Sequence, residues 1–501
     1  MTDGAESTSN PHPVGAAAVL GFAERTLLEE YTWMVVHGFC ESHKDAAKML
    51  GAFIESFSVE ASGVYVEVLL SMLLTLPSPK HKPVYYACLL MDMCKLLPSF
   101  PPKLEAALNV LFGRLSRLEI QLSSRLAEWL AFHVSNFAFS LSPFLEPWGD
   151  AIAECLLDAD PSVYDTDPRV RFVGDLLDRM VRLSYIERVS RDLTPSFLRL
   201  LPPKAEGRLD WEMPQSGDAE RGSPAYLSTM LTNRLRAKAT EEEVTSWIER
   251  ELTNHPLKVT LVMQTLLHAG AKSVSHMEKL LDKFGWLISH VGPDAPSRAE
   301  LFGASLRYWS ASTQMCGILT RKLISRGLVD PAAVIAHLFS SRGVAALLEP
   351  TSWESMTAAA EMAVELQRRA AVALREERRR WDRDVDMLDD DGERMVADAA
   401  IDRMQQGVDR ARREKKAFFA NLFVDACAAL SSRVESAAEG DTPMQEEWWR
   451  VAIGRLCAVG RIYQQDISYD TIQEIVEGSA VSQAVQEAIF GPLGQLSRYN
   501  Y

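Results

Sequence analysis

Apolar residues recur with the spacing of an α-helix along nearly the whole chain. Leu104, Leu108, Leu111, Leu115 and Leu118 fall on one helical face, and similar spacing returns in later segments. The turn dipeptide Asn-Gly does not occur, and neither Asp-Gly is flanked by the alternating apolar residues of a β-hairpin. Prolines stand at the ends of the periodic segments and not within them. We therefore expect an all-α fold with very little strand.

The helices are expected to stack as an α-solenoid of helical hairpins. Residues 85–97 are apolar nearly all round, which indicates a helix buried between others. Short turns join the successive periodic segments. No fixed repeat period is visible, but divergent arrays of helical hairpins often lack one. A solenoid is therefore favoured over a closed bundle.

Polar stretches divide the chain into domains. Residues 1–20 are expected to form a flexible tail, and the Gly-, Pro- and charge-rich residues 204–224 to form a linker. This places helical solenoid domains at 21–203 and 225–495. Within the second domain, residues 374–415 contain two charged, helix-permissive arms around an acidic centre. We expect this segment to form a short coiled-coil hairpin.

Charge and cysteine content limit the function classes. The 501 residues include 53 Lys+Arg and 68 Asp+Glu, for a formal net charge of −15. Binding nucleic acid by bulk charge needs clustered basic residues, so RNA contact would require a local patch or a partner. The seven cysteines form no C-x-x-C pair and are typical of a reducing compartment. No apolar run approaches the roughly 18 residues of a membrane span, so no membrane contact is expected.

The sequence contains no recognisable catalytic or metal-binding motif. Phosphate-binding loops, dinucleotide-binding glycines, zinc-protease helices and nucleophile elbows do not occur. His268 and His276 have only Asp282 nearby as a further metal ligand. The aspartates at 158–167 lack the glycine and the closing glutamate of a calcium loop. We therefore predict a protein that is not an enzyme, with no catalytic residues, no metal ligands and no cofactor.

Two stretches of the sequence are candidate RNA contacts. The basic residues at 375–381 end in Trp381, but glutamates interrupt them, which favours a solvated helix arm. Trp129, His133 and Phe137 share a helical face and would suit base stacking. Packing is the stronger interpretation for these rings, because aromatic side chains fill the space where helices cross.

Several stretches together resemble one family. Residues 255–284 read HPLKVTLVMQTLLHAGAKSVSHMEKLLDKF, which is similar to a long string in the large subunit of the nuclear cap-binding complex. Further similar strings follow the family's order: LLMDMCKLLP at 89–98, FHVSNFAF at 132–139, RLSYIERV at 182–189 and LTRKLISRGLVDPAAVIAHLF at 319–339. The resemblance covers roughly residues 22–490. The family's additional N-terminal helical domain and basic import signal have no counterpart in the sequence, and its acidic hairpin is longer.

The resemblance implies a fold and a function. It implies domains like the middle domain of initiation factor 4G, with 21–203 and 225–495 as the family's second and third repeats. It implies a non-enzymatic scaffold that orders a small subunit with an RNA-recognition-motif fold, which holds the 7-methylguanosine cap. Capped RNA would be bound through that subunit. Factors of splicing, RNA export and nonsense-mediated decay would bind the outer surfaces of the large subunit.

By the same resemblance the protein would act in the nucleus, with shuttling to the cytoplasm. The alternative is another initiation factor 4G-like scaffold in translation or RNA decay. The partner-binding residues are not identified by the sequence.

Overall fold

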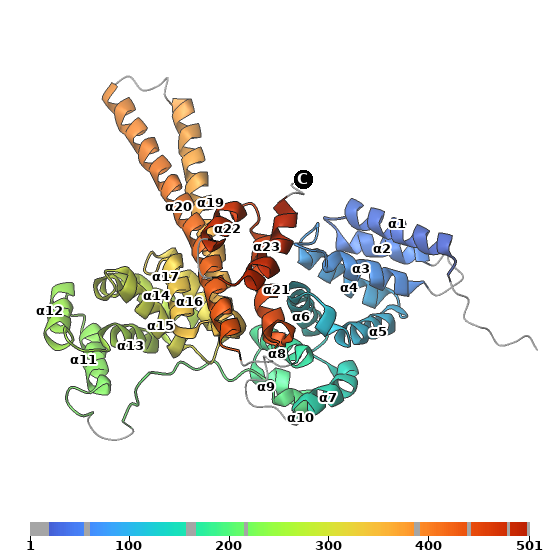
Figure 1. The fold of residues 1–501 in the computed structure, drawn as a ribbon, viewed down its shortest axis with the longest axis horizontal. Helices are drawn as coiled ribbons and strands as arrows, with labels where there is room; N and C mark the ends of the chain where they lie inside the picture. The colour runs from blue at the N-terminus through green and yellow to red at the C-terminus, as the bar shows by residue number, and fades with distance from the viewer. Residues whose placement is uncertain are drawn as a thin grey trace, which may run out of the picture.

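The structure is a computed structural model that describes residues 20–54, 61–156, 167–214, 219–384, 391–437, 442–477 and 481–497. Within these ranges every regular element is helical, which confirms the all-α prediction. The helices form two groups, one before residue 200 and one after residue 223 (Figure 1).

The first group has these bounds: α1 (Phe22–Gly38), α2 (His43–Ile54), α3 (Ser62–Leu73), α4 (Pro83–Leu96), α5 (Phe100–Phe112), η1 (Leu115–Arg117), α6 (Ile120–Ser135), α7 (Ser142–Leu156), α8 (Pro168–Arg182), α9 (Ile186–Val189), η3 (Ser190–Asp192) and α10 (Pro195–Leu198). The second group has these bounds: α11 (Pro224–Arg236), α12 (Glu241–Glu251), α13 (Lys258–Gly270), α14 (Val274–Val291), α15 (Ala295–Tyr308), α16 (Thr313–Ser325), α17 (Pro331–Arg342), α18 (Ala345–Leu348), α19 (Pro350–Asp384), α20 (Asp391–Glu435), η5 (Pro443–Gln445), α21 (Glu447–Ile462), α22 (Tyr469–Glu477) and α23 (Gln483–Ser497).

Each helix commonly packs against the next but one along the chain. In the first group α1 contacts α3, α2 contacts α4 and α3 contacts α5, while α11, α13, α15, α17 and α19 make a similar series in the second. This order is what stacked helical hairpins produce, since every second helix lies in the same layer.

Proline positions explain many of the helix starts. Proline occupies the first turn of α4, α5, α8, α10, α11, α15 and α17, where its missing N–H leaves no intrahelical bond unmade. Two prolines depart from the expected pattern, because Pro147 lies within α7 and Pro492 within α23.

The predicted leucine stripe does not form a single helix. Helix α5 ends at Phe112, and Leu115 lies in the separate turn η1. Gly113 ends α5, and glycine is a poor helix former because it loses the most backbone freedom on folding. Leu104, Leu108 and Leu115 are nevertheless all buried. The spacing of the leucines therefore predicted their burial correctly, but the prediction of one continuous helix was wrong.

Two apolar cores lie on either side of residues 204–224. One joins buried residues from Leu28 to Leu200, and the other joins residues from Leu227 to Leu493. Ile120 of α6 belongs to the second core, although it lies in the first group. A Cβ on Gly454 of α21 would lie 2.7 Å from Ile120 Cγ1, so the glycine lets α21 approach α6 closely.

The predicted linker is packed against the second group of helices where it is described. The Arg208 N–H donates to Tyr308 O at 2.8 Å, and the Asp210 N–H donates to Gln264 Oε1 at 2.8 Å. A Cβ on Gly207 would lie only 2.2 Å from the Tyr308 ring, so only glycine allows this close approach. The segment is therefore a strap across α13 and α15.

Helices α19 and α20 form a long pair that projects from the body (Figure 1). Both helices extend well beyond the hairpin expected at 374–415, because their inner halves are core elements. Phe418, Phe419 and Phe423 of α20 are fully buried there. The stretch Asp398–Glu435 is long and apolar enough to cross a membrane, but 44% of its apolar window is buried within the protein. Farther out, Leu374 and Val408 remain buried and form the seam between the arms.

Candidate functional site

A large cavity lies where the two groups of helices meet. It has a volume of about 860 Å³, and α6 and α8 line it from one side while α19 and α21 line it from the other. Figure 1 shows α6, α8 and α21 together at the centre of the molecule. We call this space the interdomain cavity. Its lining combines arginines and carboxylates with apolar side chains that include Ile120, Trp353 and Val459.

The last turn of α8 contributes the main polar contact across the cavity. Asp167 caps the start of α8 by accepting the Arg169 N–H at 2.7 Å, which fixes the helix register. Asp178 and Arg182 then lie one turn apart and form an ion pair at 2.7 Å. Both side chains face the second group of helices.

Arg182 joins the two groups directly. Its guanidinium donates to Glu354 Oε2 at 3.1 Å and to Thr313 Oγ1 at 2.9 Å, and the Thr313 hydroxyl donates to Asp178 Oδ1 at 2.9 Å. Thr313 is the first residue of α16, and Glu354 lies in the first turns of α19. We call Asp178, Arg182, Thr313 and Glu354 the interdomain latch.

Burial and neighbouring charges raise the pKa values of both Asp178 and Arg182 in the latch. Loss of hydration raises the pKa of the Asp178 carboxyl, although Arg182 and Thr313 partly oppose this. Burial also disfavours the Arg182 charge, but the carboxylates of Asp178 and Glu354 more than offset it and raise the Arg182 pKa. The arginine therefore holds a carboxylate that would otherwise be costly to bury.

Further arginines tie α21 to the first group. Arg461 pairs with Glu119 at 2.6 Å, and Arg450 donates to Leu118 O at 2.9 Å. Arg171 of α8 lies 2.6 Å from Glu447 in return. The contacts come from both sides of the boundary, so polar bonds join the two groups of helices at several points.

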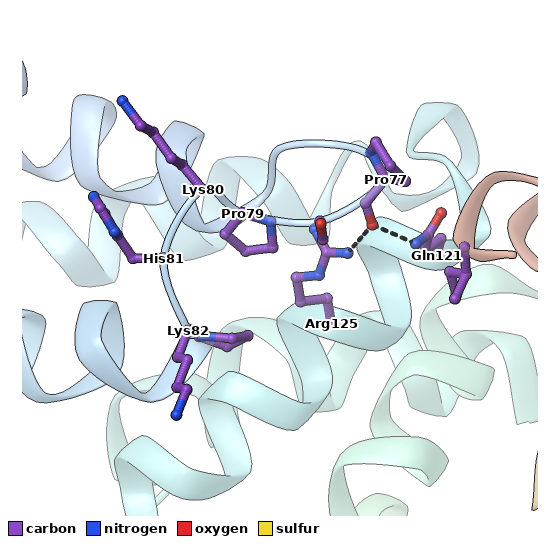
Figure 2. Close-up of a pocket in the computed structure, with 10 residues that line it drawn as sticks. Pro77, Pro79, Lys80, His81, Lys82, Gln121 and Arg125 are labelled. Atoms are coloured by element: carbon purple, nitrogen blue, oxygen red, sulfur yellow. Dashed lines mark hydrogen bonds between the residues drawn. The ribbon is translucent and has the colours of Figure 1, made fainter. Parts of the chain in front are cut away.

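A shallower depression of about 430 Å³ adjoins the cavity and shares Gln121, Arg125 and Ile462 with it. The loop between α3 and α4 forms its outer wall (Figure 2). Arg125 Nη2 and Gln121 Nε2 both donate to Pro77 O, at 2.7 and 2.8 Å. Lys80, His81 and Lys82 also line it. We call this the basic depression.

The histidines weighed as metal ligands do not converge. His268 Nδ1 lies 3.2 Å from the Tyr308 hydroxyl, while His276 Nδ1 lies 2.7 Å from Ser273 Oγ. Asp282 instead pairs with Arg326 at 2.7 Å. Among the described residues, no three His, Cys, Asp or Glu side chains are grouped as a metal site would require.

The other weighed stretches have structural partners where they are described. Of the aspartates at 158–167, only Asp167 lies within the described residues, and it caps α8. In the basic stretch, Arg378 donates to Gln405 across the hairpin at 3.1 Å, and Arg380 pairs with Glu377 at 3.3 Å. These contacts fit a solvated helix arm.

The aromatic face at Trp129 is packed inside the first group. Trp129 and His133 are buried, with ring centroids 5.2 Å apart, and Phe137 lies 4.9 Å from His133. The helix is shorter than expected, because α6 ends at Ser135 and Ala138 and Phe139 have positive φ angles of 58° and 64°. No open stacking surface results, since only Phe137 is substantially exposed.

Buried His133 predicts loss of stability in acid. Burial lowers its pKa from 6.5 to about 4, so unfolding takes up a proton once the pH falls below about 6.5. We expect the free energy of unfolding to decrease between pH 6.5 and 4, by up to about 3 kcal/mol from this residue. His337, whose pKa is also lowered to about 4, acts in the same direction.

The His133→Phe variant isolates this contribution. The phenyl ring keeps the packing between Trp129 and Phe137 and removes Nδ1, which has no hydrogen-bond partner among the described residues. Urea unfolding at pH 7 and pH 5 should give a smaller difference for the variant than for the natural chain. An equal difference in both proteins would show that His133 is not the titrating group.

Comparisons with known proteins agree with this architecture. Residues 22–195 and 225–468 each match a family described as MIF4G like. The chain is 27% identical over 478 residues to nuclear cap-binding protein subunit 1 of Gallus gallus and 27% identical over 481 residues to that of Homo sapiens. Each match covers 91% of this chain and 58% of the relative. The protein of the same name in Arabidopsis thaliana is 30% identical over 327 residues, which are 64% of this chain and 37% of that protein.

Proposed function

Because this chain belongs to the MIF4G-like family and is a distant homologue of nuclear cap-binding protein subunit 1, we propose that it is the scaffold subunit of a nuclear cap-binding complex. The family is a non-enzymatic scaffold family. The chain spans 37 to 58% of the length of the relatives named above, so the functions of the whole relatives enter as proposals. In this proposal a small RNA-recognition-motif subunit holds the 7-methylguanosine cap, and capped RNA is bound through it.

The observation that carries the proposal is the interdomain cavity. Two helical domains face each other across it, and ion pairs and hydrogen bonds fix their separation. A surface built from two domains at a fixed separation offers a folded partner a docking face that moves little on binding. It also lowers the cost of ordering that protein's flexible segments, because the surface itself does not have to reorganise.

The rings around the cavity are unsuited to holding the cap themselves. Recognition of a base between aromatic rings needs free ring faces. Trp353 has the Arg455 guanidinium 5.1 Å from its centre, and Tyr463 lies 5.1 Å from Phe419. Phe172 packs edge-on against Trp148 at 6.0 Å. The lining aromatic side chains therefore already have packing partners, which supports delegating the cap to another subunit.

Splicing factors, export adaptors and nonsense-mediated decay factors are proposed to bind the outer surfaces of the complex in the nucleus, with shuttling to the cytoplasm. Their support is the family alone. The alternative remains another initiation factor 4G-like scaffold in translation or RNA decay. No feature of the cavity favours this alternative specifically.

Titration with a fluorescent cap analogue tests the proposal. We expect weak binding by this chain or by its small subunit alone, and binding at least about tenfold tighter by the mixture, which corresponds to about 1.4 kcal/mol. The reason is that the scaffold orders the cap-binding segments of the small subunit before the cap binds, so cap binding no longer includes the free-energy cost of ordering them. Tight binding by this chain alone, competed by free cap, would contradict the scaffold role.

A cavity variant locates the docking site in the same assay. Ala311 lines the interdomain cavity, so Ala311→Trp would fill part of it. Ala106 is exposed on α5, away from the cavity, and Ala106→Trp provides the matched control. Loss of the tighter cap binding of the mixture with the first variant alone would support docking in the cavity. Equal binding by both variants would place the partner elsewhere.

A further inference from the structure

The loop between α3 and α4 presents one serine from a fixed backbone. Pro77 O is held by Arg125 and Gln121, and the side chain of Pro79 is buried (Figure 2). Ser78 lies between these two prolines and is exposed. Residues 74–82 contain no helix, so the backbone around Ser78 is free of the intrahelical bonds that would hide it. An enzyme that binds an extended segment therefore has access to this hydroxyl.

The surroundings of Ser78 are basic, in contrast to the chain as a whole. Lys80, His81, Lys82 and Arg125 line the basic depression with Ser78, and its lining includes no carboxylate. Lys80, Lys82 and Arg125 form no ion pair within the described part of the chain. The hydrogen bonds of Arg125 go to the backbone carbonyls of residues 73, 75 and 77, which do not neutralise its charge. An added anion at Ser78 would lie among Lys80, Lys82 and Arg125. Glu128 offsets part of the Arg125 charge, and the two lysine side chains, which extend in opposite directions in Figure 2, would turn toward the anion.

The other hydroxyl residues that precede a proline are placed differently. The sequence has five such positions, the other four being Ser142, Thr194, Ser223 and Thr442. Thr194 Oγ1 is buried, and the Ser223 side chain caps α11 by accepting the Tyr226 N–H. Ser142 is the first residue of α7. Thr442 is exposed, but the first charged residues after it are the acidic Glu446 and Glu447.

We propose that Ser78 is a phosphorylation site for a proline-directed protein kinase, and that Lys80, Lys82 and Arg125 hold the attached phosphate in the basic depression. In the transfer, Ser78 Oγ forms a bond to the γ-phosphorus of Mg-bound ATP. The bond from that phosphorus to the β–γ bridging oxygen breaks, ADP leaves, and the hydroxyl proton passes to the kinase base. The product carries about 1.5 to 2 negative charges at neutral pH. This proposal is independent of cap binding.

Site mapping gives the first test. The full chain is incubated with a purified proline-directed kinase and Mg-ATP, and its peptides are analysed by mass spectrometry. We expect one phosphate per chain, located on Ser78. Ser78→Ala should lose nearly all incorporation, while Ser142→Ala should retain it. Unchanged incorporation in Ser78→Ala, or a phosphate located mainly on Thr442, would overturn the proposal.

Phosphorus NMR gives the second test, because it reports on the phosphate and not on folding. Free phosphoserine has a second pKa near 6. Neighbouring cations favour the dianion, so the phosphate should titrate at lower pH in the folded chain than in the same chain in urea. The double variant Lys80→Ala and Lys82→Ala should remove much of this difference, while Lys103→Ala on α5 should not. Identical titration in folded and unfolded chains would show that the depression does not hold the phosphate.

Discussion

Replacing Trp148 by alanine is expected to remove about 3–5 kcal/mol from the free energy of unfolding of the first domain. The indole is 2% exposed and stacks between Phe112 and Phe144, with centroid distances of 4.4 and 4.5 Å. Its Nε1–H donates to Asn109 Oδ1 at 2.8 Å. The substitution therefore opens a cavity between two rings and leaves the Asn109 acceptor without this donor.

A graded series separates packing from hydrogen bonding. Trp148→Phe keeps a ring in the stack and loses the donor, so we expect a smaller loss, on the order of 1–2 kcal/mol. Phe137→Ala serves as a control at an aromatic position that is 39% exposed, where the loss should be smaller still. Urea unfolding followed by far-UV circular dichroism measures all three. A loss below about 1 kcal/mol for Trp148→Ala would mean that the stack is not part of the stable core.

The sequence predicted those parts of the fold that depend on neighbours a few residues apart. The apolar segment at 85–97 corresponds to α4, and Tyr85, Leu89 and Met93 are buried as its pattern indicated. The resemblance at 255–284 correctly identified the family, because many similar positions fall in the same order within one stretch of the chain. A local pattern gave a wrong prediction at one glycine. The leucine spacing predicted one helix through Leu115, but α5 ends before Gly113.

The candidate site could not be predicted because its contacts join distant parts of the chain. Arg182 and Glu354 are 172 positions apart, and Arg461 and Glu119 are 342 apart. An arginine at the end of an amphipathic helix usually lies in solvent, so nothing local marks Arg182 as a bridge. The same holds for the strap at Gly207, whose polar composition indicated a linker and gave no sign of packing against Tyr308.

Replacing Arg182 by alanine is expected to weaken the connection between the two domains and to lower the free energy of unfolding by about 2–4 kcal/mol. The arginine is bonded to Asp178, Glu354 and Thr313 together. Its removal leaves the Asp178 carboxylate without its ion-pair partner, and leaves Glu354 with Arg321 alone, whose Nη1 lies 3.9 Å from Glu354 Oε1. The penalty arises mainly from these uncompensated charges, and less from the lost ion pairs themselves.

Matched variants separate these contributions. Arg25 and Glu67 form a surface pair with side chains 43% and 63% exposed, so Arg25→Ala should cost no more than about 1 kcal/mol. Arg182→Lys keeps the charge but cannot reach all partners at once, so an intermediate loss is expected. Adding Asp178→Asn to Arg182→Ala should recover part of the stability by removing one buried charge. Urea unfolding measures each variant.

The functional consequence follows from rigidity. If the interdomain cavity receives the small subunit, its two walls must hold a fixed separation before the partner arrives. Arg182→Ala should then broaden the distribution of distances between labels placed on α6 and α19, as seen by single-molecule fluorescence energy transfer, and weaken small-subunit binding in parallel. Arg25→Ala should change neither. A broadened distribution with unchanged binding would mean that the partner docks on one domain alone, because such a site gains nothing from a fixed interdomain separation.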